Sequence, residues 1–182
     1  MIFIVTFGDT IYMSYFYNEI KKMKAIIRTA IASDSSAILS LIQELALFEK
    51  EPESVKLIES DIEKYGFGTT PLFRCLVAEL QHKVIGMALF YPRFSTWKGP
   101  TFHLEDLIVS EIYKGRGYGT QLYSAFIRDA YDRGVQRIEW NVLDWNISAI
   151  RFYKNSGAIV LQDWKTVQMD AQAMKNYLAK NK

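Results

Sequence analysis

The sequence predicts one α/β (α+β) domain in which helices pack on a single mixed sheet. Its 182 residues, 49% of them hydrophobic and 23% charged, suit one globular domain with a sizeable core. Segments with the two-residue period of strands alternate with segments that have the period of amphipathic helices. An apolar strand at residues 104–109 also runs into a glycine-rich turn and then a helix, an order that can present backbone N–H groups to an anion.

Local patterns define the order of the elements. Helical segments carry apolar side chains three and four residues apart, whereas strand segments alternate or form short apolar runs bounded by Gly and Pro. The expected elements are, in order, a strand at 25–29, a helix that begins at Asp34 or Ser35 and runs to Phe48, a helix at 55–65, strands at 73–79 and 84–91, a loop at 92–100, a strand at 101–109, a helix at 118–131, a strand at 137–143, a helix at 149–154, strands at 159–161 and 165–169, and a C-terminal helix with Met174 and Leu178.

Residues 1–22 are expected to form an N-terminal extension outside the fold, and residues 23–182 the domain itself. The extension opens with an apolar run, but it has no basic segment and no small-residue cleavage site, and Asp9 interrupts it too soon for a membrane span. An extra edge strand is the alternative for these residues.

The composition excludes several classes of function. The chain carries 22 Lys and Arg against 20 Asp and Glu, a net charge of +2, and no basic cluster is interleaved with aromatic residues, so no nucleic-acid partner is expected. The single Cys75 lies in an apolar strand and is expected to be a buried, inert thiol. His82 and His103 are isolated, no residues have metal-ligand spacing, and no metal site is predicted.

The glycine-rich turn is the main candidate for ligand binding. Its glycines read G-x-G-x-G at 115, 117 and 119, which matches neither the dinucleotide fingerprint nor the nucleotide P-loop. A flexible turn is the alternative reading of the glycines alone. The helical pattern that follows, closed by Gly134, places free N–H groups and a partial positive charge at the turn and favours a phosphate cradle.

Two further sites could carry chemistry. Glu105 and Asp106 are adjacent on a strand, so their side chains are expected to point to opposite faces and not to form an acid/base pair. One of them would face the ligand, unless both are ordinary strand-end carboxylates. On the short helix, Ala149, Phe152 and Tyr153 share a face, where the two aromatic residues could equally be part of the core.

Together these residues resemble the GNAT superfamily of acetyl-CoA-dependent N-acetyltransferases over about residues 25–170. The pyrophosphate loop of that superfamily reads Arg or Gln, two residues, Gly, one residue, Gly or Ala, and here Lys114, Gly117 and Gly119 fill those places. Lys in place of Arg or Gln keeps a donor near the phosphates. The resemblance implies the GNAT-type mixed, mostly antiparallel sheet flanked by helices.

A more specific resemblance is to the spermidine/spermine (diamine) acetyltransferase branch. Its shared pieces occur here in order, as residues 44–49, 66–68, 75–79, 104–106 and 145–154. Polyamine enzymes of this branch have an acidic residue before the Trp of one loop, whereas this chain has Ser95 before Trp97, a pattern similar to the thialysine N-ε-acetyltransferase subgroup. The change removes an anchor for a second ammonium group.

The resemblance implies an acetyl-CoA-dependent transfer to a primary amine of a thialysine-like, lysine-like, diamine or polyamine molecule. Glu105 would be the base acting through water, and Tyr153 the acid that protonates the departing thiolate. It also implies a homodimer and, with no membrane or nucleic-acid partner, a cytoplasmic enzyme. Another amine, such as a protein N-terminus or an antibiotic, and a non-catalytic acyl-CoA-binding role are the alternatives. The implied substrate-binding residues are Phe48, Glu49, Ser95, Trp97 and Glu105, and the implied cofactor-binding residues are Leu107, Ile108, Val109, Lys114, Gly115, Arg116, Gly117, Tyr118, Gly119, Thr120, Asn146, Ser148, Ala149 and Tyr153.

Overall fold

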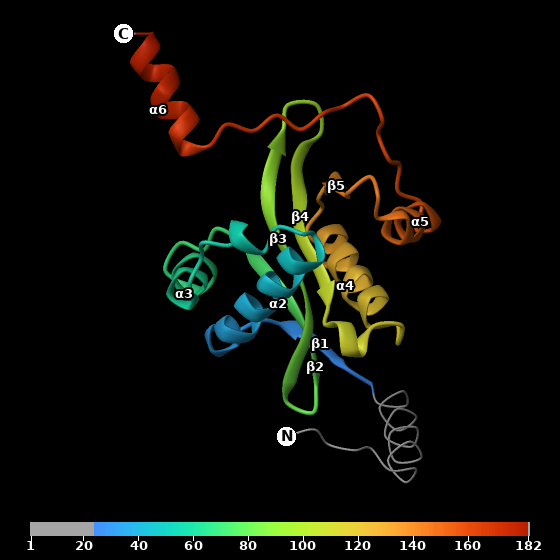
Figure 1. Ribbon diagram of the computed structural model, residues 1–182. Coiled ribbons are helices and arrows are strands. Elements are labelled where there is room, and N and C mark those ends of the chain that lie inside the picture. Colours follow the sequence, from blue (N-terminus) through green and yellow to red (C-terminus); the bar gives the residue numbers. More distant parts are fainter. Residues whose placement is uncertain (1–23, 182) are drawn as a thin grey trace, which may run out of the picture. The chain divides into compact units, whose positions relative to one another are not determined.

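The computed structural model describes residues 24–181, so the expected extension at 1–22 lies outside the described residues (Figure 1). The described chain contains two compact units, one ending at Trp140 and the other beginning at Asn141. No helix within residues 24–181 is long and apolar enough to cross a membrane.

The first unit is built on a five-stranded sheet whose strands follow the order of the sequence. The first three pairings are antiparallel, and the last one is parallel. The expected mixed, mostly antiparallel sheet with flanking helices is confirmed. Its strands are β1 (Ile26–Thr29), β2 (Arg74–Leu80), β3 (Lys83–Ser95), β4 (Gly99–Val109) and β5 (Arg137–Glu139).

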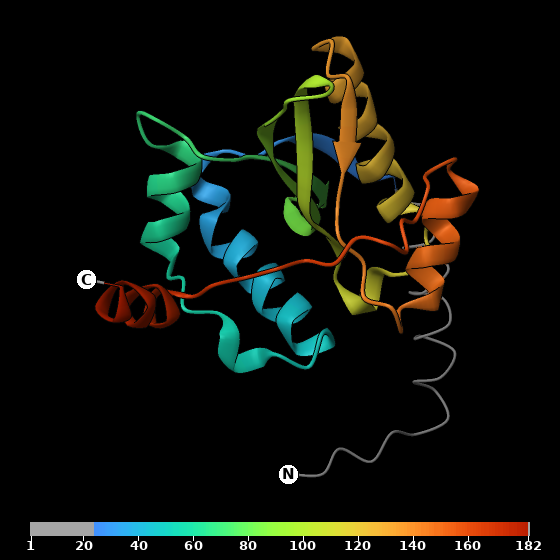
Figure 2. The ribbon, with the colours of Figure 1, turned by 90° about the horizontal axis from the view of Figure 1, so that it is seen from above.

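Helices cover both faces of this sheet (Figure 2). Neighbouring residues of β3 show which helix covers which face, because successive side chains of a strand point to opposite sides. Leu89 shares a core cluster with Ile38 and Ile62, whereas the Phe90 ring lies 4.9 Å from that of Phe126. One face is therefore covered by α2 (Ser35–Phe48) and α3 (Glu59–Phe67), and the other by α4 (Tyr118–Asp132).

Residues 92–100 are not the loop that the two prolines suggested, because β3 continues to Ser95 and β4 begins at Gly99. β2 begins opposite Phe90, so beyond that residue β3 pairs only with β4. Proline is tolerated where one edge of a strand has no ladder to complete, and Pro92 lies in such a segment. The two strands form a long arm, called the β3–β4 arm below.

Two other expected boundaries were wrong. The helix expected at 55–65 begins at Glu59, because the Asp61 carboxylate accepts the Ile58 N–H at 3.0 Å and fixes the first turn there. The strand expected at 137–143 ends at Glu139, where its partner β4 becomes irregular.

The second unit contains α5 (Ile147–Asn155) and α6 (Ala171–Lys180), capped by Asn146 and Asp170 respectively. The strands expected at 159–161 and 165–169 do not form in it. Their apolar pattern suits a strand, but a strand is stable only in a ladder, and this unit supplies no second strand within its described residues.

Candidate active site

An extra residue in β4 shapes the site. Leu89 pairs with Asp106 and the next residue of β3, Phe90, pairs with Leu104, so Glu105 has no partner of its own in the ladder. Such a bulge changes the direction in which side chains point. Glu105 and Asp106 consequently line the same hollow, and the expectation that they face opposite sides of the sheet was wrong.

The hollow has a volume of about 350 Å³ and lies on the face covered by α2 and α3. Four carboxylates line it, from Glu49 and Glu51 after α2 and from Glu105 and Asp106 of β4, and we call it the acidic hollow. No Lys, Arg or His is among the described residues that line it. Its remaining lining, apolar except for Ser54, consists of Ile42, Leu45, Ala46, Ser54, Val55, Leu57, Ile62, Phe73 and Leu89.

Two carboxyl groups of the acidic hollow, those of Asp106 and Glu49, are hard to ionise. Burial, followed by the charges of Glu105 and Glu49, raises the pKa of Asp106 to about 7. Burial also raises the pKa of Glu49. Buried carboxylates in a hollow that no basic side chain lines favour an added positive charge, so the hollow is suited to a cationic group.

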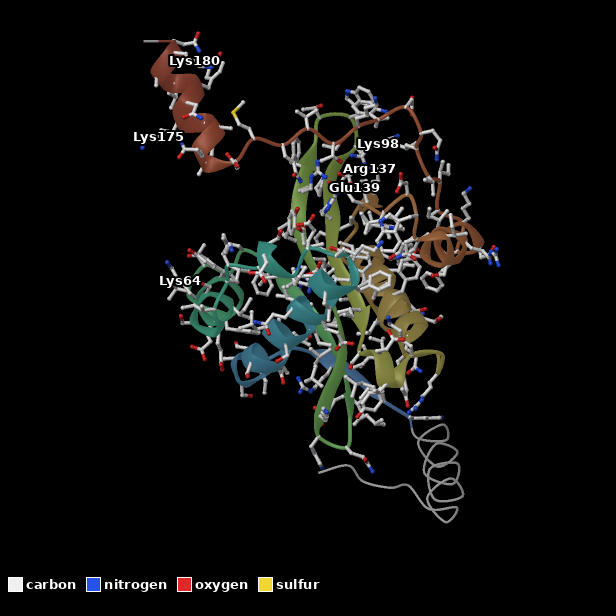
Figure 3. All side chains as sticks on the ribbon, in the orientation of Figure 1. Lys64, Lys98, Arg137, Glu139, Lys175 and Lys180 are labelled. Carbon is white, nitrogen blue, oxygen red and sulfur yellow. The ribbon has the colours of Figure 1, made fainter. Side chains whose placement is uncertain are left out.

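A second polar cluster follows the same face toward the tip of the β3–β4 arm. His103 Nε2 lies 3.7 Å from Glu105 Oε2, and its Nδ1 lies 3.2 Å from Arg93 Nη1. Arg93 also pairs with Glu139 of β5, which is bound by Arg137 at 2.9 Å, and Figure 3 shows Arg137 and Glu139 beside the arm. Burial lowers the pKa of His103, so its ring is neutral at pH 7.

The glycine-rich turn joins β4 to α4 as the sequence predicted. Gly117 is the N-cap of α4 with φ +80°, and Gly115 has φ +75°. A Cβ added at either glycine would meet no atom within 4 Å, so the backbone borders open space. The first N–H groups of a helix have no acceptor inside it, and with the helix dipole they form a site that fits a phosphate.

The outer edge of β4 beside this turn is also open. β5 pairs with β4 only from Thr101 to His103, and no other strand of residues 24–140 pairs with that edge at residues 107–109. An extended ligand can hydrogen-bond to such an edge as an added strand does.

The structure brings some of the predicted residues together. Lys114 Nζ lies 2.5 Å from Glu111 and 4.9 Å from the centre of the Phe48 ring, so a predicted cofactor residue contacts a predicted substrate residue. Glu49 and Glu105 meet in the acidic hollow. Phe48 itself does not line the hollow.

Ser95 and Trp97 lie apart from the hollow, at the tip of the β3–β4 arm. The Ser95 hydroxyl accepts the N–H groups of Trp97 at 3.3 Å and Lys98 at 3.2 Å, which fixes the turn between the strands. Trp97 is 80% exposed.

The predicted residues from Asn146 to Tyr153 belong to the second unit. The Asn146 side chain accepts the Ala149 N–H at 3.2 Å and the Ser148 hydroxyl at 3.1 Å, so these three residues build the first turn of α5. Tyr153 lies farther along α5, with its ring 5.4 Å from that of Phe152.

Sequence reasoning missed Asp106, Arg93 and His103 as site residues. The strand period placed Asp106 on the wrong face, because one extra residue in a ladder leaves no local trace. Arg93 fell in the expected loop at 92–100, and its contacts come from other strands. Within residues 24–181, no group of His, Cys, Asp and Glu has an arrangement that could hold a metal ion.

Comparison with known proteins defines the class. The model of the acetyltransferase (GNAT) family matches residues 37–158, and the chain belongs to that family. It is therefore an N-acetyltransferase of a family that uses acetyl-CoA as the acetyl donor.

Individual relatives agree with this membership. The chain is 37% identical to the thialysine N-epsilon-acetyltransferase of Bos taurus over 166 residues, which cover 85% of this chain and 98% of the bovine protein. It is also 37% identical to the Mus musculus protein of the same name, over 82% of this chain and 94% of the other. An integron cassette protein from the mobile metagenome of V. cholerae shares the fold, with a TM-score of 0.71 and 24% identity over 87% of this chain and 99% of that one.

Asp106→Asn tests the electrostatics of the acidic hollow. The pKa of about 7 exceeds the value of about 3.9 in an unfolded chain, so the folded state binds more protons between those values. The free energy of unfolding of the wild type should therefore fall as the pH rises from about 5 to about 7.5, by up to about 3 kcal/mol more than that of Asp106→Asn. Urea unfolding at the two pH values measures this. Asp132→Asn, at the exposed end of α4, should keep the wild-type slope, and equal slopes in all three proteins would contradict the assignment.

Proposed function

We propose that the protein transfers the acetyl group of acetyl-CoA to a primary amine of a small molecule, which is thialysine-like or lysine-like, or else a diamine or polyamine. The acidic hollow carries this proposal, because an apolar recess with carboxylates and no basic lining residue suits an alkyl ammonium group. The names of the bovine and mouse relatives support an acceptor related to thialysine.

The donor would bind along the last residues of β4 and the turn after them. Leu107, Ile108 and Val109 would pair through their main chain with the pantetheine arm, at the strand edge that β5 leaves open. The turn from Lys114 to Thr120 would hold the pyrophosphate on its backbone N–H groups. Lys114 would then exchange its contact with Glu111 for a phosphate, and the α5 residues Asn146, Ser148 and Ala149 would line the cofactor.

The acceptor must lose a proton before it can attack. An alkyl ammonium has a pKa of about 10.4, so only about one molecule in ~10³ is neutral at pH 7. Glu105 is half exposed at the edge of the acidic hollow and would accept this proton through a water molecule. Glu49 and Phe48 would help to position the amine.

The remaining steps complete the transfer. The amine nitrogen would bond to the thioester carbon, and the oxyanion that forms would accept a hydrogen bond from backbone N–H near Leu107. When the carbon–sulfur bond breaks, coenzyme A leaves as a thiolate, which the Tyr153 hydroxyl would protonate. The products are an N-acetyl amide and coenzyme A.

The proposed compartment, assembly and partners rest on the resemblance to the GNAT acetyltransferases described above. We propose a cytoplasmic homodimer that needs no metal ion and has no membrane or nucleic-acid partner. Ser95 and Trp97 at the tip of the β3–β4 arm would contact the far end of the acceptor, where the Ser95 hydroxyl offers no charge to a second ammonium group.

Acetyl-CoA turnover on a panel of amines is the direct test. Thialysine, lysine, ornithine, putrescine, spermidine, a peptide with a free N-terminus and an aminoglycoside should be assayed at equal concentration by thiol release. We expect the amino acids with a side-chain amine to give the highest kcat/KM. Turnover of the peptide or the aminoglycoside alone would replace this proposal, and acetyl-CoA binding without any turnover would indicate a non-catalytic role.

Gly117→Val tests the phosphate cradle. A branched residue disfavours φ +80° and adds atoms where the phosphates would approach the backbone. Calorimetric titration should show that affinity for acetyl-CoA falls at least about tenfold, because a helix-terminal anion contact is lost. Gly134→Val is the matched control, since Gly134 has φ +70° and equally open surroundings at the other end of α4. It should lose similar stability but keep its affinity; equal affinity losses would contradict the cradle.

Glu105→Gln tests the base. We expect kcat/KM to fall by roughly 10²–10⁴ near neutral pH, the usual range for general acid–base groups. The loss should shrink as the pH approaches the pKa of the amine, because the acceptor then arrives already neutral. Glu111 is an exposed carboxylate outside the acidic hollow. Glu111→Gln therefore removes the same charge and should keep the wild-type pH profile of kcat/KM. A loss in Glu105→Gln that stays constant across pH would instead indicate that Glu105 only positions the substrate.

A further inference from the structure

Arg93 lies on the same face of β3 as the acidic hollow. Side chains two residues apart on a strand share a face, so Leu89, Tyr91 and Arg93 point to one side. Leu89 lines the hollow, and Arg93 is therefore placed on that face farther out along the β3–β4 arm. An acceptor whose amine is in the hollow would extend toward Arg93 if it lies along the strand.

The Arg93 guanidinium is held firmly on one side only. Its Nη1 lies 3.2 Å from His103 Nδ1 and pairs with Glu139. Its Nε and Nη2 have no protein partner within residues 24–181, and the side chain is 47% exposed. A fixed guanidinium with a free Nε–Nη2 edge is the form that binds a carboxylate through two parallel hydrogen bonds.

The charges around Arg93 favour an anion. Glu139 is shared between Arg93 and Arg137, so two guanidinium groups surround one carboxylate and leave a net positive charge. The neutral His103 ring adds no charge to this cluster. The cluster is positive, the acidic hollow is negative, and both lie on one face of the sheet.

The distance between Arg93 and Glu105 matches the distance between the two charged ends of an amino acid such as lysine. His103 contacts Glu105 at 3.7 Å through one ring nitrogen and Arg93 at 3.2 Å through the other. With the imidazole between them, the guanidinium and the Glu105 carboxylate are separated by at most roughly 9 Å, given ring bonds of about 1.3–1.4 Å. An extended lysine side chain places ~7–8 Å between its amine and its α-carboxyl carbon, across six bonds of about 1.5 Å.

We propose that Arg93 forms a carboxylate-binding subsite, which holds the α-carboxylate of an amino-acid acceptor while the side-chain amine of that acceptor lies beside Glu105. This subsite rests on the proposed amine acetylation and, among the proposed acceptors, separates amino acids that carry a second, terminal amine from diamines and polyamines. Arg137 acts through Glu139 and is a positioning residue for the Arg93 side chain.

The test compares two acceptors that differ only in the carboxylate. L-lysine and 1,5-diaminopentane have the same alkyl chain and terminal amine, and only lysine offers the group that Arg93 would bind. The wild type should have a higher kcat/KM for lysine. In Arg93→Gln this advantage should fall by about tenfold to hundredfold, the effect of losing a charge-assisted hydrogen-bonded pair, while kcat/KM for 1,5-diaminopentane stays within about threefold.

Two further variants serve as controls for this test. Arg133→Gln removes an arginine that pairs with Asp129 on α4, and it should leave the lysine-to-diamine ratio unchanged. Arg93→Lys keeps the charge without the planar edge and should retain part of the ratio, which a merely misfolded arm would not.

The outcomes separate this subsite from the function on which it rests. An equal loss for both acceptors in Arg93→Gln, or a wild type that prefers 1,5-diaminopentane, would overturn the subsite while amine acetylation stands. A wild type that acetylates neither of these acceptors nor any amine of the wider panel would overturn the acetylation itself.

Discussion

The extra residue at Glu105 is the constraint on which the rest of the site depends. β3 and β4 remain paired on both sides of it, from Gly86 opposite Val109 to Ser95 opposite Gly99. In a regular ladder Asp106 would face the α4 side of the sheet. The bulge turns both carboxylates toward α2 and α3 instead, and the long paired segments around it stabilise an irregularity that a short hairpin could not hold.

The same irregularity separates the two halves of β4. Before it, from Thr101 to His103, β4 is paired with β5, and after it the outer edge of Leu107–Val109 is open. The open edge leads into the glycine-rich turn, while the bulged carboxylates face the acidic hollow. One strand thus presents a place for an extended donor and a place for a cationic acceptor only a few residues apart, which is the proximity that a group transfer requires.

The sequence predicted the parts of this site that depend on local structure. The turn from Lys114 to Gly119 and the helix after it follow from glycine positions and a helical period, which are read within one segment. The role of Asp106 depends on how β4 pairs with β3, and the contacts of Arg93 depend on β4 and β5. Pairing between distant segments leaves no periodic signal in the sequence. The roles of these side chains could therefore be identified only from the folded structure. The strands expected at 159–161 and 165–169 do not form for the converse reason, because their local strand pattern has no partner strand among the described residues of the second unit.

The ionisation of Asp106 couples acceptor binding to the release of a proton. Its pKa of about 7 means that near neutrality the group is protonated in part of the molecules, because burial and two neighbouring carboxylates oppose its charge. An ammonium group among the same carboxylates favours the ionised form and lowers that pKa. Binding of a cationic acceptor would therefore release a proton from the hollow and exchange repulsion between carboxylates for attraction to the substrate. By linkage, the cationic acceptor binds more tightly as the pH rises through the pKa of Asp106.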